Sequence, residues 1–424
     1  MQERDQIMEK LAEFISSHMN DDISRLLLAR SKWPEIDMDI AVNSIESRRK
    51  LKGKVQEWYD NHSLIFPIRL SAEQCSSSAT AHYKAALAER IALASPDSGA
   101  DWRIADLTGG LGVDSWFFSK KASEVLYNEM QTVLCEAACH NFKALGSSNI
   151  RISNNAVGNG PSELSPSALL SEFCPDIVYM DPARRGEGGR KVFLIEECTP
   201  DVLTLKDEIF GIARHILIKL SPMADISMVC ERLGTCCREV HAVAAGGECK
   251  ELLIWMDREW KDELSIHAVE LQGDYPASEP AVFCFRPSEE RTPATMPIGG
   301  RHYLFEPGKA LMKSGAFNLI GTRYGIAKLG KSTHYYIFDD QEKIQILKGL
   351  GKVFEIIRYE SLDKRTMKAA CCDFPKAEVT ARNIPMDTDT LRKRLGVTSG
   401  DDAHIFGLKS DSEGNLLLCT KRML

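Results

Sequence analysis

The feature that most constrains this chain is a glycine-rich turn at residues 105–114, which reads A-D-L-T-G-G-L-G-V-D. The apolar pair before Asp106 is typical of the end of a strand, and the pattern after Val113, D-S-W-F-F-S-K-K, predicts the first turns of a helix. Glycine accepts positive φ and, because it lacks a Cβ, lets a ligand touch the backbone. Free N–H groups at a helix start also favour electron-rich ligand groups. The stretch therefore predicts a strand, a ligand-binding turn and a helix.

Two classes of cofactor site use such a turn. A dinucleotide site requires G-x-G-x-x-G, and here Ser115 stands where the third glycine would be. The pattern D-x-x-x-G-x-G, which begins at Asp106, resembles motif I of the class I S-adenosylmethionine-dependent methyltransferases. In that family the acidic residue ends the first strand and the glycines pass under the methionine part of the cofactor. The resemblance implies cofactor contacts from Asp106, Thr108, Gly109, Gly110, Gly112 and Asp114.

Residues 101–257 alternate strand and helix patterns, which predicts an α/β fold. The expected strands are residues 103–107, 123–129, 150–155, 176–181, 215–220, 239–245 and 251–256. Parallel strands joined by helical crossovers make a Rossmann-like, doubly wound sheet, and ligands bind beyond the carboxyl ends of its strands. Polar residues fall at or near these ends in five of the expected strands: Asp106, Glu129, Asn154-Asn155, Asp181 and Lys219.

Two of these strand ends fit an adenosyl group. Glu129 comes 17 residues after Gly112, and its carboxylate can accept both ribose hydroxyls. The same arrangement serves NAD-binding proteins, so Glu129 does not separate the two cofactors. Asn155 stands where the resembled family often has an Asp that reads the adenine amino group. Its amide oxygen can still accept a hydrogen bond from that amine.

The segment D-P-A-R-R, from Asp181 to Arg185, follows the apolar strand I-V-Y-M. It resembles motif IV, the [D/N]-P-P-x loop of nucleic-acid and amine methyltransferases, with Ala183 in place of the second proline. The resemblance implies catalytic roles for Asp181 and Pro182, because a rigid loop can hold the Asp side chain as a hydrogen-bond acceptor for the target nitrogen. Arg184 and Arg185 can bind phosphate in forked geometry, which makes them candidate substrate contacts.

Lys219 ends the fifth expected strand and is a further candidate substrate contact. A supporting role beside Asp181 is the alternative. The residues after Lys219 are L-S-P, without a Cys-Pro pair, so the carbon-5 pyrimidine mechanism has no obvious cysteine nucleophile here. Neutral ring or exocyclic nitrogens are the targets that this constellation suits.

The region before the sheet reads as helical over residues 1–95. Serines after residue 75 are expected to cap a helix over residues 79–94. Many class I enzymes have such a helix, which closes over the methionine end of the cofactor. Gln74, Thr80 and Lys84 are its candidate contacts, with simple capping and packing as the alternative for each.

The local composition changes after residue 275, because five prolines occur from Pro276 to Pro297. We expect a methyltransferase domain over 96–274, a connector or small αβ subdomain over 275–345 and a smaller α+β domain over 346–424. Residues 301–424 carry 21 Lys and Arg against 15 Asp and Glu, a net charge of +6, which leaves −13 for residues 1–300 of a chain whose total is −7. A basic C-terminal part favours a polyanionic partner, although ordinary surface variation would also account for it. The candidate phosphate contacts are Lys328, Lys331, Arg382, Arg392, Lys393, Arg394, Lys421 and Arg422.

These motifs together resemble a bacterial branch of the class I methyltransferases that carries a THUMP-like C-terminal domain. The resemblance is strongest over 70–255 and approximate after 275. THUMP domains are associated with RNA binding, so it implies S-adenosylmethionine as cofactor, an RNA such as rRNA or tRNA as partner, and methylation of a base nitrogen. The alternatives are an NAD-type oxidoreductase, an RNA-binding protein with an inactive methyltransferase fold, and a methyltransferase that acts on DNA or protein.

Composition predicts no metal and no membrane. The 13 cysteines include no C-x-x-C pair, so free thiols in a reducing compartment are the expectation. No apolar run reaches the roughly 18 residues that a transmembrane helix needs. The first residues, M-Q-E-R-D-Q-I-M-E-K, are charged and carry no apolar signal segment, so we expect a cytoplasmic protein.

Overall fold

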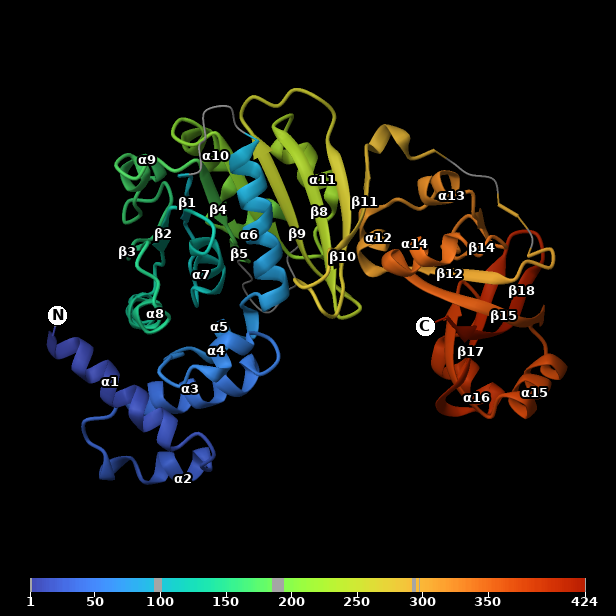
Figure 1. Ribbon diagram of the computed structural model, residues 1–424, viewed down its shortest axis with the longest axis horizontal. Coiled ribbons are helices and arrows are strands. Elements are labelled where there is room, and N and C mark those ends of the chain that lie inside the picture. The colour runs from blue at the N-terminus through green and yellow to red at the C-terminus, as the bar shows by residue number, and fades with distance from the viewer. Residues whose placement is uncertain (1, 95–100, 185–193, 292–294, 297, 424) are drawn as a thin grey trace. The chain divides into compact units, whose positions relative to one another are not determined.

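The structure is a computed structural model that describes residues 2–94, 101–184, 194–291, 295–296 and 298–423 (Figure 1). It divides into two compact units. The first comprises Met1–Val240 and Glu251–Asp262, and the second comprises His241–Lys250 and Glu263–Leu424. The expected division into four parts is finer than this one and stays a prediction.

The first unit begins with helices, as the sequence predicts for residues 1–95. They are α1 (Gln2–Ser17), α2 (Ile23–Leu28), η1 (Arg30–Lys32), α3 (Met38–Leu51), α4 (Gln56–Asp60), α5 (Arg69–Gln74) and α6 (Ser78–Leu93). Asp22, Asp37 and Ser77 cap α2, α3 and α6 by accepting hydrogen bonds from backbone N–H groups of the first turn. Apolar side chains at helical spacing, among them Ile15 and Ile45, form the core of this region.

A buried arginine holds the chain between α3 and α5. Arg48 is 1% exposed and lies with its guanidinium 5.1 Å from the centre of the Phe66 ring. The guanidinium donates to four backbone carbonyls, those of Trp58, Tyr59, Asn61 and Leu64, at 2.7–3.1 Å. Burial lowers the pKa of Arg48 to about 10. Because Arg48 satisfies four carbonyls at once, it fixes the path of an otherwise irregular segment.

Seven strands that lie wholly or partly in the first unit follow one another in the order β8-β9-β7-β4-β1-β2-β3. They are β1 (Arg103–Asp106), β2 (Glu124–Asn128), β3 (Ile150–Ser153), β4 (Ile177–Met180), β7 (His215–Leu220), β8 (Cys237–Ala245) and β9 (Glu248–Asp257). Strands β3, β2, β1, β4 and β7 are parallel, and β9 pairs with β7 in the antiparallel sense. The seven strands expected from the sequence are confirmed, and the reversed direction of β9 is an addition that apolar patterning does not encode.

Helical crossovers connect the parallel strands: α7 (Val113–Ser119), α8 (Thr132–Ala144), α9 (Pro166–Leu170), α10 (Val202–Phe210) and α11 (Ile226–Leu233). A two-stranded sheet forms between β5 (Ala183–Arg184) and β6 (Cys198–Thr199), preceded by η3 (Ile195–Glu197). Strands β1 and β4 are almost wholly buried, as expected for the centre of a doubly wound sheet. No helix of the described residues is long and apolar enough to cross a bilayer.

The second unit contains β10 (Ser265–Leu271), which pairs with β11 (Ala281–Phe285), followed by η4 (Pro287–Glu289). A separate seven-stranded sheet then has the order β13-β14-β12-β15-β18-β17-β16. Its strands are β12 (Tyr303–Pro307), β13 (Ala327–Lys328), β14 (Tyr336–Phe338), β15 (Gly351–Ser361), β16 (Lys376–Arg382), β17 (Thr398–Ser410) and β18 (Gly414–Arg422). Its helices are α12 (Lys309–Ser314), α13 (Leu319–Tyr324), α14 (Lys343–Leu350), α15 (Lys364–Asp373) and α16 (Thr388–Leu395).

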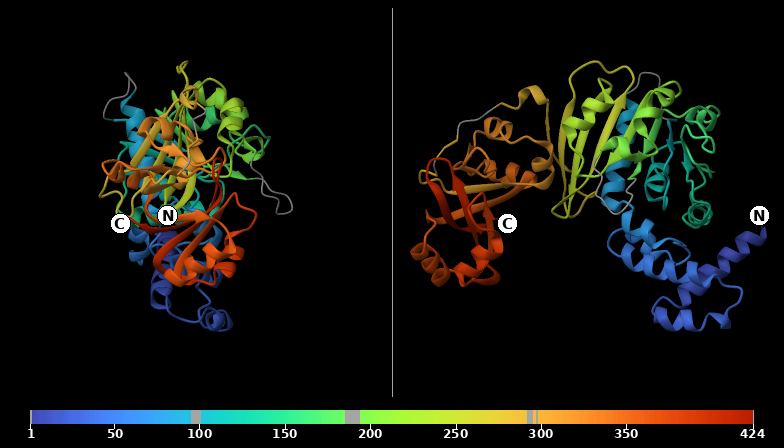
Figure 2. Two further views of the ribbon diagram at one scale, coloured as in Figure 1. Left: turned by 90° about the vertical axis from the view of Figure 1, so that its right-hand side faces the viewer. Right: turned by 180° about the vertical axis from the view of Figure 1, so that it is seen from behind.

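Helices α15 and α16 lie together beside the strands at the C-terminal end of this sheet, drawn in orange and red (Figure 1, Figure 2). Alternate residues of one strand serve the two cores: Leu417 packs in the cluster with α15 and α16, and Leu416 and Leu418 pack in the other. The segment from Lys309 to Tyr324 forms two helices and not one, because Gly315 adopts φ +86° at the end of α12.

Candidate functional site

The glycine turn lies between β1 and α7, and its glycines have different roles. Gly110 and Gly112 adopt φ +53° and +93°. A Cβ on Gly109 would lie 2.2 Å from Cε2 of Tyr127, so only glycine fits against that ring. A Cβ on Gly110 would meet no atom nearer than the Thr108 carbonyl oxygen, at 3.7 Å. The Tyr127 hydroxyl, which comes from β2, donates to the Gly110 carbonyl at 2.7 Å and so fixes the turn against the sheet. Gly109 therefore packs the turn, and Gly110 leaves its outer side open to a ligand.

Asp106 ends β1 and is 1% exposed. Its Oδ1 accepts from the Thr108 backbone N–H at 3.0 Å and from the Thr108 hydroxyl at 3.3 Å, and its Oδ2 accepts from the Ser115 hydroxyl. Burial raises the pKa of Asp106 to about 7, against the opposing hydrogen bonds from Ser115 and Thr108. Ser115, which stands where the dinucleotide pattern has its third glycine, thus donates a hydrogen bond to the carboxyl group of Asp106 at the end of β1.

Glu129 follows β2 and faces the turn. Its Oε2 accepts from the Gly110 N–H at 2.8 Å, and its Oε1 accepts from the Gln131 N–H at 2.7 Å. Each carboxylate oxygen keeps acceptor capacity, so the ribose contact expected for Glu129 remains chemically open. Asn155 donates from its amide to Ser153 Oγ at 2.7 Å, which orients its amide oxygen as an acceptor. Asn128 was not among the residues predicted from the sequence. Its side-chain amide donates to the backbone carbonyls of Leu107 and Asn155, so it links the segment after β1 to the segment after β3.

The D-P-A-R loop follows β4 at the same sheet edge. The Asp181 backbone N–H donates to the Thr108 hydroxyl at 2.7 Å, and the Asp181 carboxylate pairs with the Lys219 ammonium. The Asp181 side chain is 39% exposed, whereas that of Lys219 is 14% exposed. Pro182 is buried. The side chain of Arg184 and the whole of Arg185 lie outside the described residues, so their substrate contacts stay predictions.

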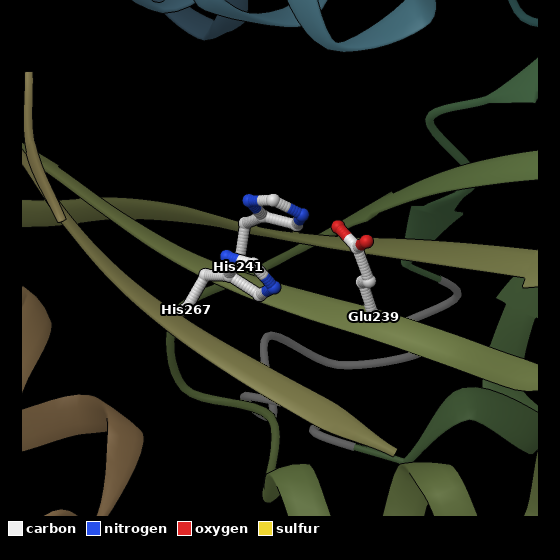
Figure 3. Close-up of side chains that lie close together, drawn as sticks. All are labelled: Glu239, His241 and His267. Atoms are coloured by element: carbon white, nitrogen blue, oxygen red, sulfur yellow. The ribbon is translucent and has the colours of Figure 1, made fainter. Parts of the chain in front are cut away.

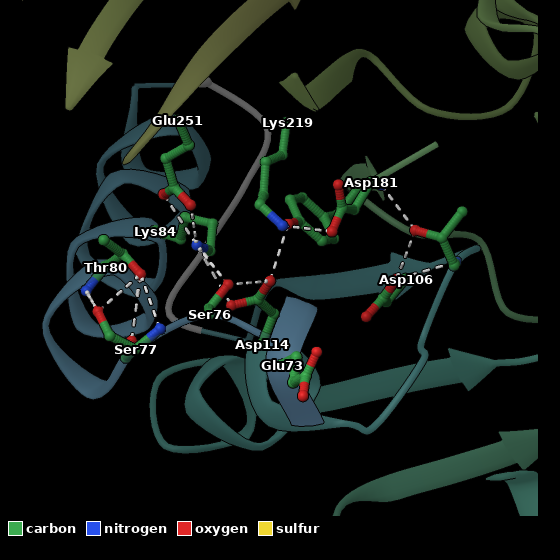
Figure 4. Close-up of polar contacts among 12 residues, drawn as sticks. Glu73, Ser76, Ser77, Thr80, Lys84, Asp106, Asp114, Asp181, Lys219 and Glu251 are labelled. Carbon is green, nitrogen blue, oxygen red and sulfur yellow. Dashed lines mark hydrogen bonds and ion pairs between the residues drawn. The ribbon is translucent and has the colours of Figure 1, made fainter. Parts of the chain in front are cut away.

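Behind this loop lies a buried ionic cluster, which consists of Lys84 on α6, Asp114 on α7 and Glu251 on β9 (Figure 4). The Lys84 ammonium lies 2.8 and 2.9 Å from the two Glu251 oxygens and 3.4 Å from Asp114 Oδ1. The Ser76 and Tyr179 hydroxyls both donate to Asp114 Oδ2 at 2.9 Å. Lys84 is 0% exposed and satisfied by these partners, which places it behind the site and not on its surface.

Opposite charges set the pKa values in this region. Burial opposes ionisation of Asp114, yet the Lys84 and Lys219 cations lower the pKa of Asp114. Burial likewise opposes a charge on Lys219, but Asp181, Asp114 and Glu251 raise the pKa of that ammonium. For Glu251 burial prevails and raises the pKa, against Lys84 and Lys219. Sequence reasoning passed over Ser76, Tyr179 and Glu251. The available signal for Glu251 is a charged residue inside an apolar strand, which requires a buried partner.

The other two candidates on the helices before β1, Thr80 and Gln74, differ in exposure to solvent. Thr80 is 2% exposed and forms a capping box with Ser77: its hydroxyl accepts from the Ser77 N–H at 3.1 Å. This is the capping alternative weighed for that residue, and cofactor contact by Thr80 stays a prediction. Gln74 ends α5 and is exposed.

The basic residues of the second unit differ in accessibility. Lys328 is 3% exposed and donates to Asn318 Oδ1 at 3.1 Å, so its expected contact with phosphate is wrong. Arg392 lies 3.3 Å from Glu378 and is partly neutralised. The exposed candidates are Lys331, Arg382, Lys393, Arg394, Lys421 and Arg422.

One group of side chains has the composition of a metal site. Ligand atoms of Glu239, His241 and His267 lie within 4.8 Å of one another (Figure 3). However, the Arg90 guanidinium already binds both carboxylate oxygens of Glu239, and the two imidazole rings stack with their centres 4.4 Å apart. Glu239 also belongs to the first unit and the histidines to the second. We therefore assign no metal to these residues.

Comparisons with known proteins agree with the fold. A family model described as a ferredoxin-like domain matches residues 303–343, and one described as THUMP domain-like matches residues 351–421. No curated protein matches the sequence. A solved structure from Porphyromonas gingivalis W83, provisionally described as a methyltransferase, is similar over 98% of both chains, with 28% identity and a TM-score of 0.84.

Two further solved structures are similar over less than half of this chain. A methyltransferase subunit of a type I restriction-modification system from Streptococcus thermophilus has 13% identity, a TM-score of 0.34 and coverage of 47% of both chains. An rRNA methylase from the same species has 11% identity and a TM-score of 0.28, and covers 42% of this chain and 94% of its own. Neither similarity is strong enough to bear on substrate.

Proposed function

We propose that this chain, which has the class I methyltransferase fold with a THUMP-like C-terminal domain, transfers a methyl group from S-adenosylmethionine to a nitrogen of an RNA base. Methyltransferase activity and the cofactor follow from the similarity over 98% of the chain and from the motif residues at one sheet edge. The identity of the methyl acceptor, a nitrogen of an RNA base, is what the proposal adds. The same fold in an NAD-type oxidoreductase would leave the D-P-A-R loop and its lysine partner without a role.

The residues of the turn fit S-adenosylmethionine. The open side of Gly110 leaves room beside the backbone, Glu129 can accept ribose hydroxyls, and Asn155 presents an amide oxygen toward which an adenine amine could donate. The cofactor supplies an electrophilic methyl group on its sulfonium. The task left to the chain is to orient a nitrogen and accept its hydrogen bond.

The observation that carries the proposal is the position of Asp181. Its carboxylate is the outermost acid of the site, and its backbone is tied to the glycine turn through Thr108. A carboxylate held beside the cofactor turn can accept a hydrogen bond from an amino or ring N–H group and align the nitrogen for attack. Lys219 neutralises part of that charge and restrains the side chain.

RNA is supported as the partner by the THUMP-like match and by the basic surface of the second unit. Exposed cations occur on the last turn of α16, at Lys393 and Arg394, and at the end of β18, at Lys421 and Arg422. Phosphate contacts from such residues position a nucleic acid without reading its sequence. Ordered pairs such as Arg392 with Glu378 contribute less to this surface.

The test is methyl transfer from labelled S-adenosylmethionine to RNA, DNA and protein fractions from cells that lack the gene. We expect label in the RNA fraction, on a base nitrogen, and its loss with Asp181→Ala while cofactor affinity stays within about threefold. Loss of a positioned acceptor should lower turnover by about a hundredfold or more. Label in DNA or protein alone would overturn the RNA assignment, and a parallel loss of cofactor affinity would place Asp181 in the cofactor site.

A further inference from the structure

The charges behind the D-P-A-R loop are unequal in number. Three carboxylates, those of Asp181, Asp114 and Glu251, share two ammonium groups, those of Lys219 and Lys84. Side-chain exposure falls steadily from the loop inward: 39% for Asp181, 14% for Lys219, 12% for Asp114, 3% for Glu251 and 0% for Lys84. Asp181 is therefore the most exposed charge of the group, and Lys84, which lies between Asp114 and Glu251, is the least exposed.

Lys219 is the group for which the carboxylates compete. It pairs directly with Asp181, and Asp114 and Glu251 also attract its charge from the buried side. Lys84 offsets that attraction, because its ammonium group lies beside both buried carboxylates. It contacts both Glu251 oxygens and is the nearest described cation to Asp114 Oδ1, a buried oxygen that has no hydrogen-bond donor among the described residues. Burial makes an uncompensated carboxylate costly, so the balance between the two ammonium groups matters.

We propose that Lys84 is a positioning residue for the reaction: by neutralising Asp114 and Glu251, it leaves the Lys219 ammonium to Asp181. This inference rests on the proposed methyl transfer. It assigns to α6 a role that differs from contact with the cofactor. Lys84 acts through Lys219 and contacts neither the RNA nor S-adenosylmethionine. Without Lys84, two buried carboxylates would face one ammonium, and Lys219 would move toward them and release Asp181.

The first variant is Lys84→Met, which keeps the length of the side chain and removes its charge. We expect the turnover number for methylation of RNA from cells lacking the gene to fall by about 10- to 100-fold, the range for a misplaced group at a reacting centre. The affinity for S-adenosylmethionine should stay within about threefold, because Lys84 is 0% exposed and contacts Ser76, Asp114 and Glu251. An unchanged turnover number in a folded variant would overturn the proposal.

The second variant separates positioning from simple stability. Lys84→Met combined with Glu251→Gln removes one cation and one anion and restores the net charge of the group. We expect it to recover at least about a tenth to a half of the wild-type turnover number if charge balance is what matters. If both variants were equally impaired, packing around Lys84 and not its charge would be responsible, and the proposal would fail.

Arg90→Met is the matched control. Arg90 lies on the same helix and pairs with Glu239 on β8, so its loss also breaks an ion pair between α6 and the sheet. The Arg90 partner is Glu239, whereas the Lys219 partner is Asp181, so turnover should be retained although the melting temperature falls. Equal loss of turnover in Arg90→Met would show that any disturbance of α6 is sufficient, which contradicts a specific role for Lys84.

A crystal structure of Lys84→Met tests the inference independently of activity. We expect the Lys219 Nζ to leave Asp181 and approach Asp114 or Glu251, and to return to Asp181 in the double variant. Lys219 in its original place beside Asp181 would refute the mechanism even if turnover fell. Since this readout needs no substrate, it also separates failure of this inference from failure of the proposed function, which would appear as absent methyl transfer by the wild type.

Discussion

The hydroxyl of Thr108 accepts a hydrogen bond from the backbone N–H of Asp181 at 2.7 Å. Thr108 belongs to the glycine turn after β1, and Asp181 begins the loop after β4, so one hydroxyl couples the two motifs. The same hydroxyl lies 3.3 Å from Asp106 Oδ1 and donates to it. The position of the acceptor carboxylate is thus set by the turn that would hold the cofactor.

Thr108→Val tests this coupling because valine matches the shape of threonine and lacks the hydroxyl. The Asp181 N–H would lose its acceptor, which costs about 1–3 kcal/mol and corresponds to about a tenfold or larger change in rate if the loop shifts. We expect slower methyl transfer with modest change in cofactor affinity, as measured by calorimetry. Thr108→Ser, which keeps the hydroxyl, should remain close to the wild type; equal losses in both variants would disprove the role of the hydrogen bond.

Gly109 and Gly110 should respond differently to alanine. A methyl group on Gly109 collides with the Tyr127 ring, so Gly109→Ala should lower the melting temperature and disrupt the turn. Gly110→Ala meets open space at φ +53°, and its conformational strain is only about 1–2 kcal/mol. We expect Gly110→Ala to fold and to bind S-adenosylmethionine at least about tenfold more weakly, since the methyl group enters the side left open for the ligand. Unchanged affinity in folded Gly110→Ala would exclude a cofactor contact there.

Asp106 should make stability depend on pH. Burial raises the pKa of Asp106 to about 7 in the folded protein, whereas an aspartate in an unfolded chain has a pKa of about 3.9. Between these values only the folded state binds the proton, so this residue's contribution to the free energy of unfolding falls as pH rises toward about 7 and is constant above it.

Asp106→Asn removes that titration. The free energy of unfolding of the variant, relative to the wild type, should therefore rise by about 2 kcal/mol between about pH 5.5 and pH 7.5. Urea titrations at both pH values measure it. Asp363→Asn is the control: hydrogen bonds from the Thr366 N–H and its neighbours lower the pKa of Asp363, so that group is ionised in both states over this range and its difference from wild type should not change with pH. A difference for Asp106→Asn that is independent of pH would contradict the raised pKa.

Arg48 should be essential for stability and not for chemistry. It donates to four carbonyls between residues 58 and 64. Arg48→Met would leave these buried acceptors without a donor, and we expect the free energy of unfolding to fall by at least about 3 kcal/mol. Arg25→Met is a suitable control because Arg25 is exposed, and exposed substitutions usually change stability by less than about 0.5 kcal/mol. Similar effects from the two variants would show that the carbonyl contacts contribute little.

The exposed cations of α16 and β18 should contribute to RNA affinity. We expect Lys393→Gln, Arg394→Gln, Lys421→Gln and Arg422→Gln, combined in one variant, to weaken RNA binding and to reduce its salt dependence, by a slope of about 0.7 for each single-strand phosphate that the variant no longer neutralises. Filter binding at several salt concentrations measures both quantities. Arg25 and Lys32 are exposed cations of the N-terminal helices and provide a control pair. An unchanged slope in the folded quadruple variant would remove this surface from the RNA-binding site.

The sequence by itself determined the local elements and the sheet edge. Apolar runs with polar ends predicted the strands that end at Asp106, before Glu129 and before Asp181, and the structure has them there. These signals are local: a buried strand requires a continuous apolar run, and a turn with positive φ requires glycine. The expected α+β character of residues 346–424 depends on the same kind of local signal, because alternate residues of one strand pack into the two cores of the second sheet.

Tertiary structure decided which polar side chains are partners. Lys84 and Glu251 are 167 residues apart, and no local pattern shows that they share a buried ion pair. The same reason explains why Lys328 looked like a surface cation and is buried, since accessibility depends on what packs above a residue. Burial and pairing are properties of segments brought together by the fold, and their electrostatic energies depend on distance and surroundings that a single sequence does not specify.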